Sequence, residues 1–164
     1  MSDGIARFNA LPPEEAEPRL FECFANRVWA SRVAAGRPYQ DLAALWAAAE
    51  AAWSELAPSD WLEAFAAHPR IGERGGHSPA SSEREQSEVM RASSRTLAEL
   101  ATENRRYEAR FGHVFLISAG GRGAEEILAA LRQRLDNDPM TEIGVAAQEH
   151  RKITRLRLER LLKG

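Results

Sequence analysis

The sequence predicts an all-α protein, folded as one compact, bundle-like domain of about seven or eight helices. Apolar residues recur with a helical period in most segments, and proline, glycine or asparagine separates those segments. There is no β-hairpin signal and no alternation of strands with helices. The length of 164 residues suits a single domain, which would bury roughly 70% of the surface of the unfolded chain. We expect this domain to span residues 1–164, with residues 1–10 as a loose lead-in.

Four helices are predicted in the first half of the chain. The stretch 12–15, Pro-Pro-Glu-Glu, begins the first, because proline and acidic residues favour an initial helical turn. Residues 26–35 form the second, and residues 41–56 form a third with the apolar spacing of an amphipathic helix. A short fourth helix ends at or before His68, because Pro69 disfavours helical geometry in the residue before it.

The second half of the chain begins with a glycine-rich loop, residues 72–79. Ser81 or Ser82 then opens the longest predicted helix, which Gly112 ends. Residues 113–118 are apolar and β-branched, which is typical of an extended segment or a buried linker. Two more helices are expected, one after the turn at 119–123 and one over about 141–162.

Charge and cysteine content exclude several classes of protein. A formal net charge of −2 provides no overall basic field for binding nucleic acid. The single cysteine, Cys23, cannot form an internal disulfide, which favours a reducing cytoplasm. The sequence contains neither a signal-peptide pattern nor an apolar run of the ~18 residues that a membrane span needs. We therefore expect a cytoplasmic protein that binds neither nucleic acid nor membranes.

His68 is the first candidate for chemistry. A histidine at a helix end can simply interact favourably with the last carbonyl groups through the helix dipole. Its imidazole can also exchange a proton near neutral pH, and a position that faces a loop would let a substrate reach it. The local sequence leaves both interpretations open.

Ser82 and Glu85 form an S-x-x-E pattern at the start of the longest predicted helix. This pattern is typical of a capping box, in which Glu85 would reach back to the backbone amide of Ser82. Glu85 also lies on the helical row that continues through Val89 and Leu97 into the core. A carboxylate in that position could instead orient and charge-stabilise an imidazole, as the acid of a catalytic triad does.

Arg157 is the third candidate, because it falls among apolar neighbours in a row of the last helix that also holds His150 and Ile153. A guanidinium stays charged, so its burial demands either a structural carboxylate or an anionic ligand. The four histidines lack H-x-x-x-H or H-E-x-x-H spacing, and one cysteine cannot form a cysteine-rich zinc site. We expect no metal.

Several stretches resemble a known family when they are taken in order. They are HPRIGE (68–73), SSEREQ (81–86), RYEARFGHVFLIS (106–118), GRGAEEILAALRQRLDNDPMTE (121–142) and KITRLRL (152–158). The sequence resembles the decarboxylases of 2-oxo-4-hydroxy-4-carboxy-5-ureidoimidazoline (OHCU), which form (S)-allantoin in the last step from urate. The resemblance covers nearly the whole chain. It implies an all-α fold, no cofactor, a small anionic substrate and, as in many members, a homodimer.

The site residues follow from the matched motif positions. The resemblance implies that His68, Glu85 and Arg157 are catalytic and that Pro69 lies at the substrate. It also implies substrate contacts by residues of two further motifs: Ser82, Gln86, Phe115, Leu116, Ile117, Ser118 and Ala119. The chain departs from the family pattern in the stretch HPRIGERGGHSPAS (68–81) and in His113-Val114, where many members have Phe-Pro.

These observations combine in one hypothesis of mechanism. His68, oriented by Glu85, would act as the acid or base, and Arg157 would bind the carboxylate or a developing enolate oxygen. Loss of carbon dioxide leaves electrons that the substrate ring can hold, so no cofactor is needed as an electron sink. Three alternatives remain: a related enzyme for another ureido or purine-breakdown compound, a metal-dependent hydrolase, and a non-enzymatic helical interaction module.

Overall fold

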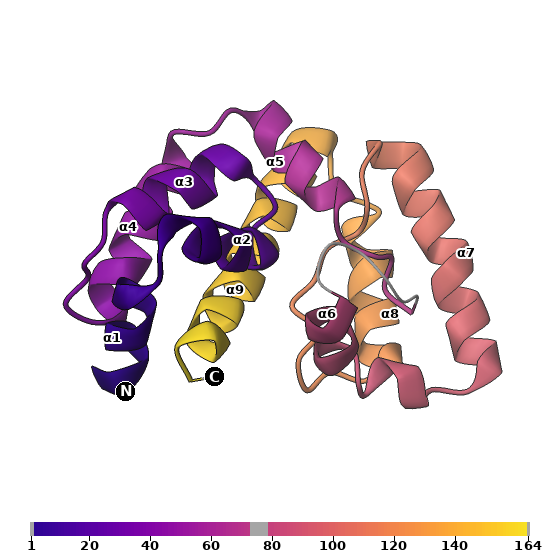
Figure 1. The fold of residues 1–164 in the computed structure, drawn as a ribbon. Coiled ribbons are helices and arrows are strands. Elements are labelled where there is room, and N and C mark those ends of the chain that lie inside the picture. The colour runs from indigo at the N-terminus through magenta and orange to yellow at the C-terminus, as the bar shows by residue number, and fades with distance from the viewer. Residues whose placement is uncertain (1, 73–78, 164) are drawn as a thin grey trace. The chain divides into compact units, whose positions relative to one another are not determined.

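The computed structural model describes residues 2–72 and 79–163. These residues contain nine α-helices, one short 3-10 helix and no strand (Figure 1), which confirms the all-α prediction with slightly more helices than expected. The elements are α1 (Ser2–Ala10), α2 (Pro13–Cys23), α3 (Arg27–Ala35), α4 (Leu42–Ser54), α5 (Pro58–Ala66), α6 (Pro79–Glu85), η1 (Val89–Arg91), α7 (Ser94–Phe111), α8 (Ala124–Arg134) and α9 (Pro139–Lys163).

The chain divides into two compact units. The first holds the described residues of 1–64 and 153–164, and the second holds those of 65–152. Helix α9 therefore contributes its first part to the second unit and its last turns to the first. The single domain over 1–164 stays a prediction. In the described part of the chain, no helix has the length and apolar character needed to cross a membrane.

Residues 2–10 fold as α1, whereas the sequence predicted a loose lead-in. Ile5 and Phe8 are buried in the core of the first unit. Asn9 Nδ2 donates to the carbonyl of Tyr39, and the Tyr39 amide donates to Asn9 Oδ1, both at 2.9 Å. These partners are 30 residues apart. The local sequence pattern could not reveal them, which explains why the lead-in prediction is wrong.

The rest of the first unit is a set of helices that pack in chain order, with α3 against both α2 and α4. Asn26 caps α3 by accepting a hydrogen bond from the Trp29 amide at 2.8 Å, at the start predicted from the sequence. The Trp29 indole is buried and donates to the carbonyl of Ala49 at 3.0 Å, which links α3 to α4.

In the second unit, the longest predicted helix is interrupted, and α6 and α7 are separate elements. Ala92 is extended, with φ −66° and ψ 160°, and Ser93 caps α7 by accepting a hydrogen bond from the Thr96 amide at 3.2 Å. A serine hydroxyl competes for nearby backbone amides, so serine favours a cap over a helix interior. The apolar row of the sequence continued across this break, which is why the single long helix was wrong.

The core of the second unit encloses a buried ion pair between Arg134 and Glu142. Arg134 Nε donates to Glu142 Oε2 at 2.9 Å, and Glu142 also accepts hydrogen bonds from the Tyr107 hydroxyl and, at 3.0 Å, from Asn137 Nδ2. The Glu142 residue is 0% exposed. Burial, together with the hydrogen bond to Glu142, raises the pKa of the Tyr107 hydroxyl, so this group stays protonated and donates.

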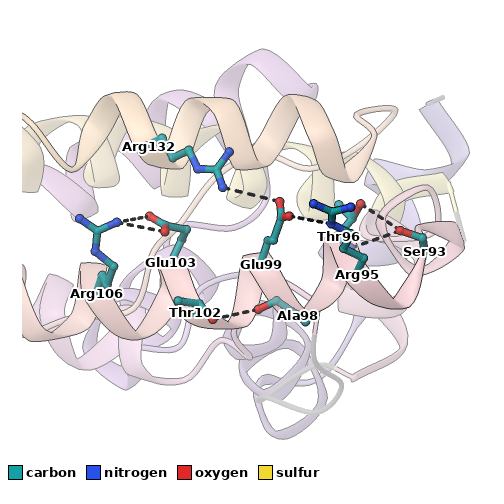
Figure 2. A network of polar contacts seen from close by, with 9 residues as sticks. All are labelled: Ser93, Arg95, Thr96, Ala98, Glu99, Thr102, Glu103, Arg106 and Arg132. Carbon is teal, nitrogen blue, oxygen red and sulfur yellow. Dashed lines mark hydrogen bonds and ion pairs between the residues drawn. The ribbon is translucent and has the colours of Figure 1, made fainter.

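A second set of ion pairs lies on the surface of α7 and α8 (Figure 2). Glu99 of α7 contacts Arg95 at 3.5 Å and reaches Arg132 of α8 at 3.6 Å. These side chains are well exposed, and exposed pairs of this kind contribute about 0–1 kcal/mol. Removing one partner from the buried cluster around Glu142 is therefore expected to cost more stability than removing one from this surface set.

Replacing Glu142 by Gln should lower the free energy of unfolding by about 3–5 kcal/mol, because the buried Arg134 guanidinium would lose its counter-charge. Glu99→Gln is the matched control, since it removes exposed pairs and should cost at most about 1 kcal/mol. Urea unfolding curves measure both. Equal unfolding midpoints for the two variants would contradict the importance of the buried pair.

Candidate functional site

His68 lies just after α5, at the helix end predicted from the sequence. Pro69 follows it and restricts its backbone to non-helical geometry. The His68 amide donates to the carbonyl of Phe65 at 3.1 Å, which closes the last turn. The residue is only 8% exposed, so most of the imidazole is buried.

The His68 ring meets a second imidazole, that of His150 on α9. The two Nε2 atoms are 2.9 Å apart, and the rings are nearly perpendicular, at 82°. His150 is 0% exposed and also packs edge-on against the Phe65 ring, with ring centroids 5.2 Å apart. A hydrogen bond between two imidazole nitrogens needs one N–H and one lone pair, so the pairing couples the proton positions of the two rings.

The segment that follows the His-Pro step is held by two amide side chains. The Gly72 amide donates to Gln86 Oε1 at 2.8 Å, and Asn104 Nδ2 donates to the carbonyl of Ile71 at 3.0 Å. Gly72 has φ +94°, a conformation that favours glycine. The structure therefore brings Gln86 next to the chain segment that carries His68. The rest of the predicted loop, residues 73–78, lies outside the described residues.

Ser82 and Glu85 both belong to α6, which already includes Pro79. Ser82 is thus inside the helix, and its carbonyl accepts a hydrogen bond from the Gln86 amide at 3.0 Å. Glu85 is the last residue of the helix and not part of a first turn, so the capping-box interpretation is wrong. Ser82 is buried and Glu85 is half-buried. The orientation of His68 by Glu85 stays a prediction.

Residues 115–119 form a largely buried, irregular segment, as expected for a buried linker. Phe115, Leu116, Ile117 and Ala119 are at most 4% exposed. Arg134 Nη1 donates to the carbonyl of Leu116 at 2.7 Å, so the buried ion pair described above also holds this segment.

Glu149 of α9 fixes the same segment at a second point. Its Oε1 accepts a hydrogen bond from the Ser118 amide at 2.9 Å, and its Oε2 lies 2.6 Å from Lys152 Nζ. Burial raises the pKa of the Glu149 carboxyl, but the hydrogen bonds from Lys152 and the Ser118 amide outweigh it, and the net pKa is lowered. Glu149 therefore remains an acceptor at neutral pH. It already binds the backbone amide of Ser118, a residue that the resemblance assigned to substrate contact.

Arg157 is buried, as predicted, with 3% exposure. It lies in the part of α9 that belongs to the first unit, and its Nη1 donates to the carbonyl of Glu22 at 3.1 Å. The Glu22 carbonyl is therefore one of the polar partners that a buried guanidinium needs. The role of Arg157 together with His68 stays a prediction.

Sequence reasoning missed His150, Glu149 and Asn104 as parts of this site. His150 lies in the same helical row as Arg157, but its spacing to the other histidines along the chain does not indicate a partner. It lies 82 residues from His68, so only the fold reveals the pair. In the described ranges, no group of three His, Cys, Asp or Glu side chains is arranged to hold a metal ion.

Known proteins resemble this chain in sequence and in fold. The family model of OHCU decarboxylase matches residues 9–159. The uric acid degradation bifunctional protein TTL of Arabidopsis thaliana is 37% identical over 145 residues, which are 85% of this chain and 45% of that protein. The chain therefore spans less than half the length of this relative.

Two further comparisons cover nearly the full length of the matched protein. The 2-oxo-4-hydroxy-4-carboxy-5-ureidoimidazoline decarboxylase of Haloferax volcanii is 28% identical over 156 residues, which are 94% of this chain and 93% of that protein. A crystal structure of OHCU decarboxylase in the presence of (S)-allantoin has a TM-score of 0.79 and 32% identity, and the match covers 90% of this chain and 99% of that chain. With a family match that covers residues 9–159, the chain belongs to the OHCU decarboxylase family.

Proposed function

We propose that this chain catalyses the decarboxylation of OHCU to (S)-allantoin, a step of urate degradation. The match of the family model over residues 9–159 carries the proposal. The Haloferax volcanii relative, which is named for this substrate, supports it because the similarity covers 93% of that protein. The similar crystal structure, determined in the presence of (S)-allantoin, supports it further.

The proposed decarboxylation does not need a cofactor as an electron sink. The substrate carries its carboxylate beside an imine-like carbon, so the electrons left by carbon dioxide can be held in the ring. The protein must bind an anion, align the scissile bond with the ring and deliver one proton to one face. Delivery to a single face is what makes one enantiomer of allantoin.

His68 acts in this proposal as the acid or base, on the 4-hydroxyl group or at the carbon that is protonated. Glu85 orients or charge-stabilises its imidazole, and Arg157 binds the carboxylate or the developing enolate oxygen. The contacts of Gln86 with Gly72 and of His68 with His150 support a pre-organised site, since both fix the chain around the His-Pro step.

The remaining substrate contacts come from Pro69, Ser82, Gln86 and the segment 115–119. Gln86 uses Oε1 to hold the Gly72 amide, so its Nε2 group is the part assigned to the ureido or ring edge of the substrate. The Ser118 amide donates to Glu149, so residue 118 meets the substrate with other groups. The proposal also includes a cytoplasmic location and a homodimer.

Incubation of the purified chain with freshly generated OHCU tests the proposal. Circular dichroism should record (S)-allantoin in large enantiomeric excess, whereas spontaneous decay through a planar intermediate gives both enantiomers. No gain in the rate of (S)-allantoin formation would sink the proposal. Turnover of another ureido compound alone would instead favour the related-enzyme alternative.

Replacing His68 by Asn should lower kcat by about 10²–10⁴-fold, because the side chain no longer exchanges a proton near neutral pH. The far-ultraviolet dichroism and the melting temperature should stay close to those of the wild type. His113→Phe is the matched control, since His113 packs on the same Phe65 ring, at 5.7 Å between ring centroids, and has no assigned role in catalysis. An active H68N enzyme would contradict the role of His68.

Replacing Glu85 by Gln should lower kcat by about 10²-fold, because the shape is kept but the charge that stabilises an imidazolium is lost. Glu83→Gln is its control: Glu83 lies in the same short helix but is exposed, so its loss should leave kcat within about twofold. If E85Q changes only the melting temperature, Glu85 has a structural role and the interaction-module alternative gains support.

A further inference from the structure

The His68 imidazole contacts another imidazole, that of His150. His150 Nε2 lies 2.9 Å from His68 Nε2, with the ring planes at 82°. This distance is that of a hydrogen bond, and the two rings are held edge to face instead of stacked. The contact joins α9 to the end of α5 inside the second unit.

His150 cannot meet a substrate directly, because it is 0% exposed. The Phe65 ring covers it edge-on at 5.2 Å, and its backbone lies within α9, 11 residues after the start of that helix at Pro139. Its position is therefore set by the helix and the surrounding core. Any effect of His150 on a reaction must pass through the groups that it touches, and the His68 imidazole is the one among them that is proposed to react.

The geometry restricts the protons of the pair. Two N–H groups cannot face each other at hydrogen-bond distance, and neither can two lone pairs, so one Nε2 carries the proton and the other accepts it. Two adjacent imidazolium charges would repel each other, so the geometry favours a pair with no more than one positive charge. When His68 takes up a proton, its Nε2–H can donate to the neutral His150, and this charge-assisted hydrogen bond stabilises the imidazolium.

We infer that His150 is a positioning residue that holds the His68 ring through Nε2 and fixes its tautomer, so that His68 exchanges a proton with the substrate through Nδ1. This inference rests on the proposed role of His68 in OHCU decarboxylation. In this arrangement His150 orients the ring from the side away from the substrate, and the proposed contribution of Glu85 is to stabilise the charge of the imidazolium.

Two substitutions of His150 test the inference. His150→Phe keeps a ring in the core but removes the nitrogen, and should lower kcat roughly 10- to 100-fold, as the loss of an orienting partner does elsewhere, with little change in KM. His150→Gln can still donate or accept a hydrogen bond, so it should recover part of kcat.

His113→Phe is the control for removing a histidine that packs on Phe65. Should H150F fail to fold, His150→Leu takes its place, since it also removes the nitrogen, and a kcat of H150L equal to that of wild type would overturn the inference.

A spectroscopic arm does not depend on turnover. Long-range ¹H–¹⁵N correlation spectra of the labelled protein, with His68 assigned through H68N, report which ring nitrogen carries the proton. His68 should show one dominant tautomer in the wild type and in H113F, and a mixture in H150F. An unchanged tautomer in H150F, or an unchanged kcat in that variant, would overturn the inference.

A wild-type chain that does not turn over OHCU would overturn the proposed function, and with it the catalytic meaning of the pair. An active wild type with an inactive H68N and a fully active H150F would leave the proposed function intact and overturn only the role of His150.

Discussion

The carboxylate of Glu142 is the group on which the second unit depends most. It lies in the first turn of α9, fully buried, and accepts hydrogen bonds from Arg134, Tyr107 and Asn137. A buried pair of this kind need not stabilise more than apolar packing would, but it fixes one arrangement, because a misplaced charge in the core is costly. Arg134 also donates a hydrogen bond to the carbonyl of Leu116, so the same ion pair helps to hold the segment 115–119 in place.

The same part of α9 presents two further polar side chains to the second unit. Glu149 holds the Ser118 amide, and the next residue, His150, meets His68. Both residues follow Glu142 by about two helical turns and lie on the same side of the helix. One rigid element thus sets the positions of both the apolar segment and the imidazole. A reaction that needs alignment and one proton, without a cofactor, depends on such fixed geometry.

Much of this architecture could be predicted from the sequence, because amphipathic periods, proline steps and capping residues are local signals. The start of α3 at Asn26 and the helix end at His68-Pro69 were found in this way. The break at Ser93 was missed because the apolar row continues across it, and α1 was missed because its ties to Tyr39 are remote in sequence. The contacts of His150 with His68 and of Asn104 with Ile71 depend on the tertiary fold, and spacing along the chain does not predict them.

The residues assigned to the site come from distant parts of the chain. The proposed site requires that they all contact the same ligand. A crystal structure of this chain with (S)-allantoin tests it most directly. The ligand should lie against Pro69, within hydrogen-bond distance of His68 Nδ1 and of the Arg157 guanidinium, while His68 Nε2 stays on His150. Allantoin bound away from His68, or bound there with Arg157 turned to another partner, would contradict the site described above.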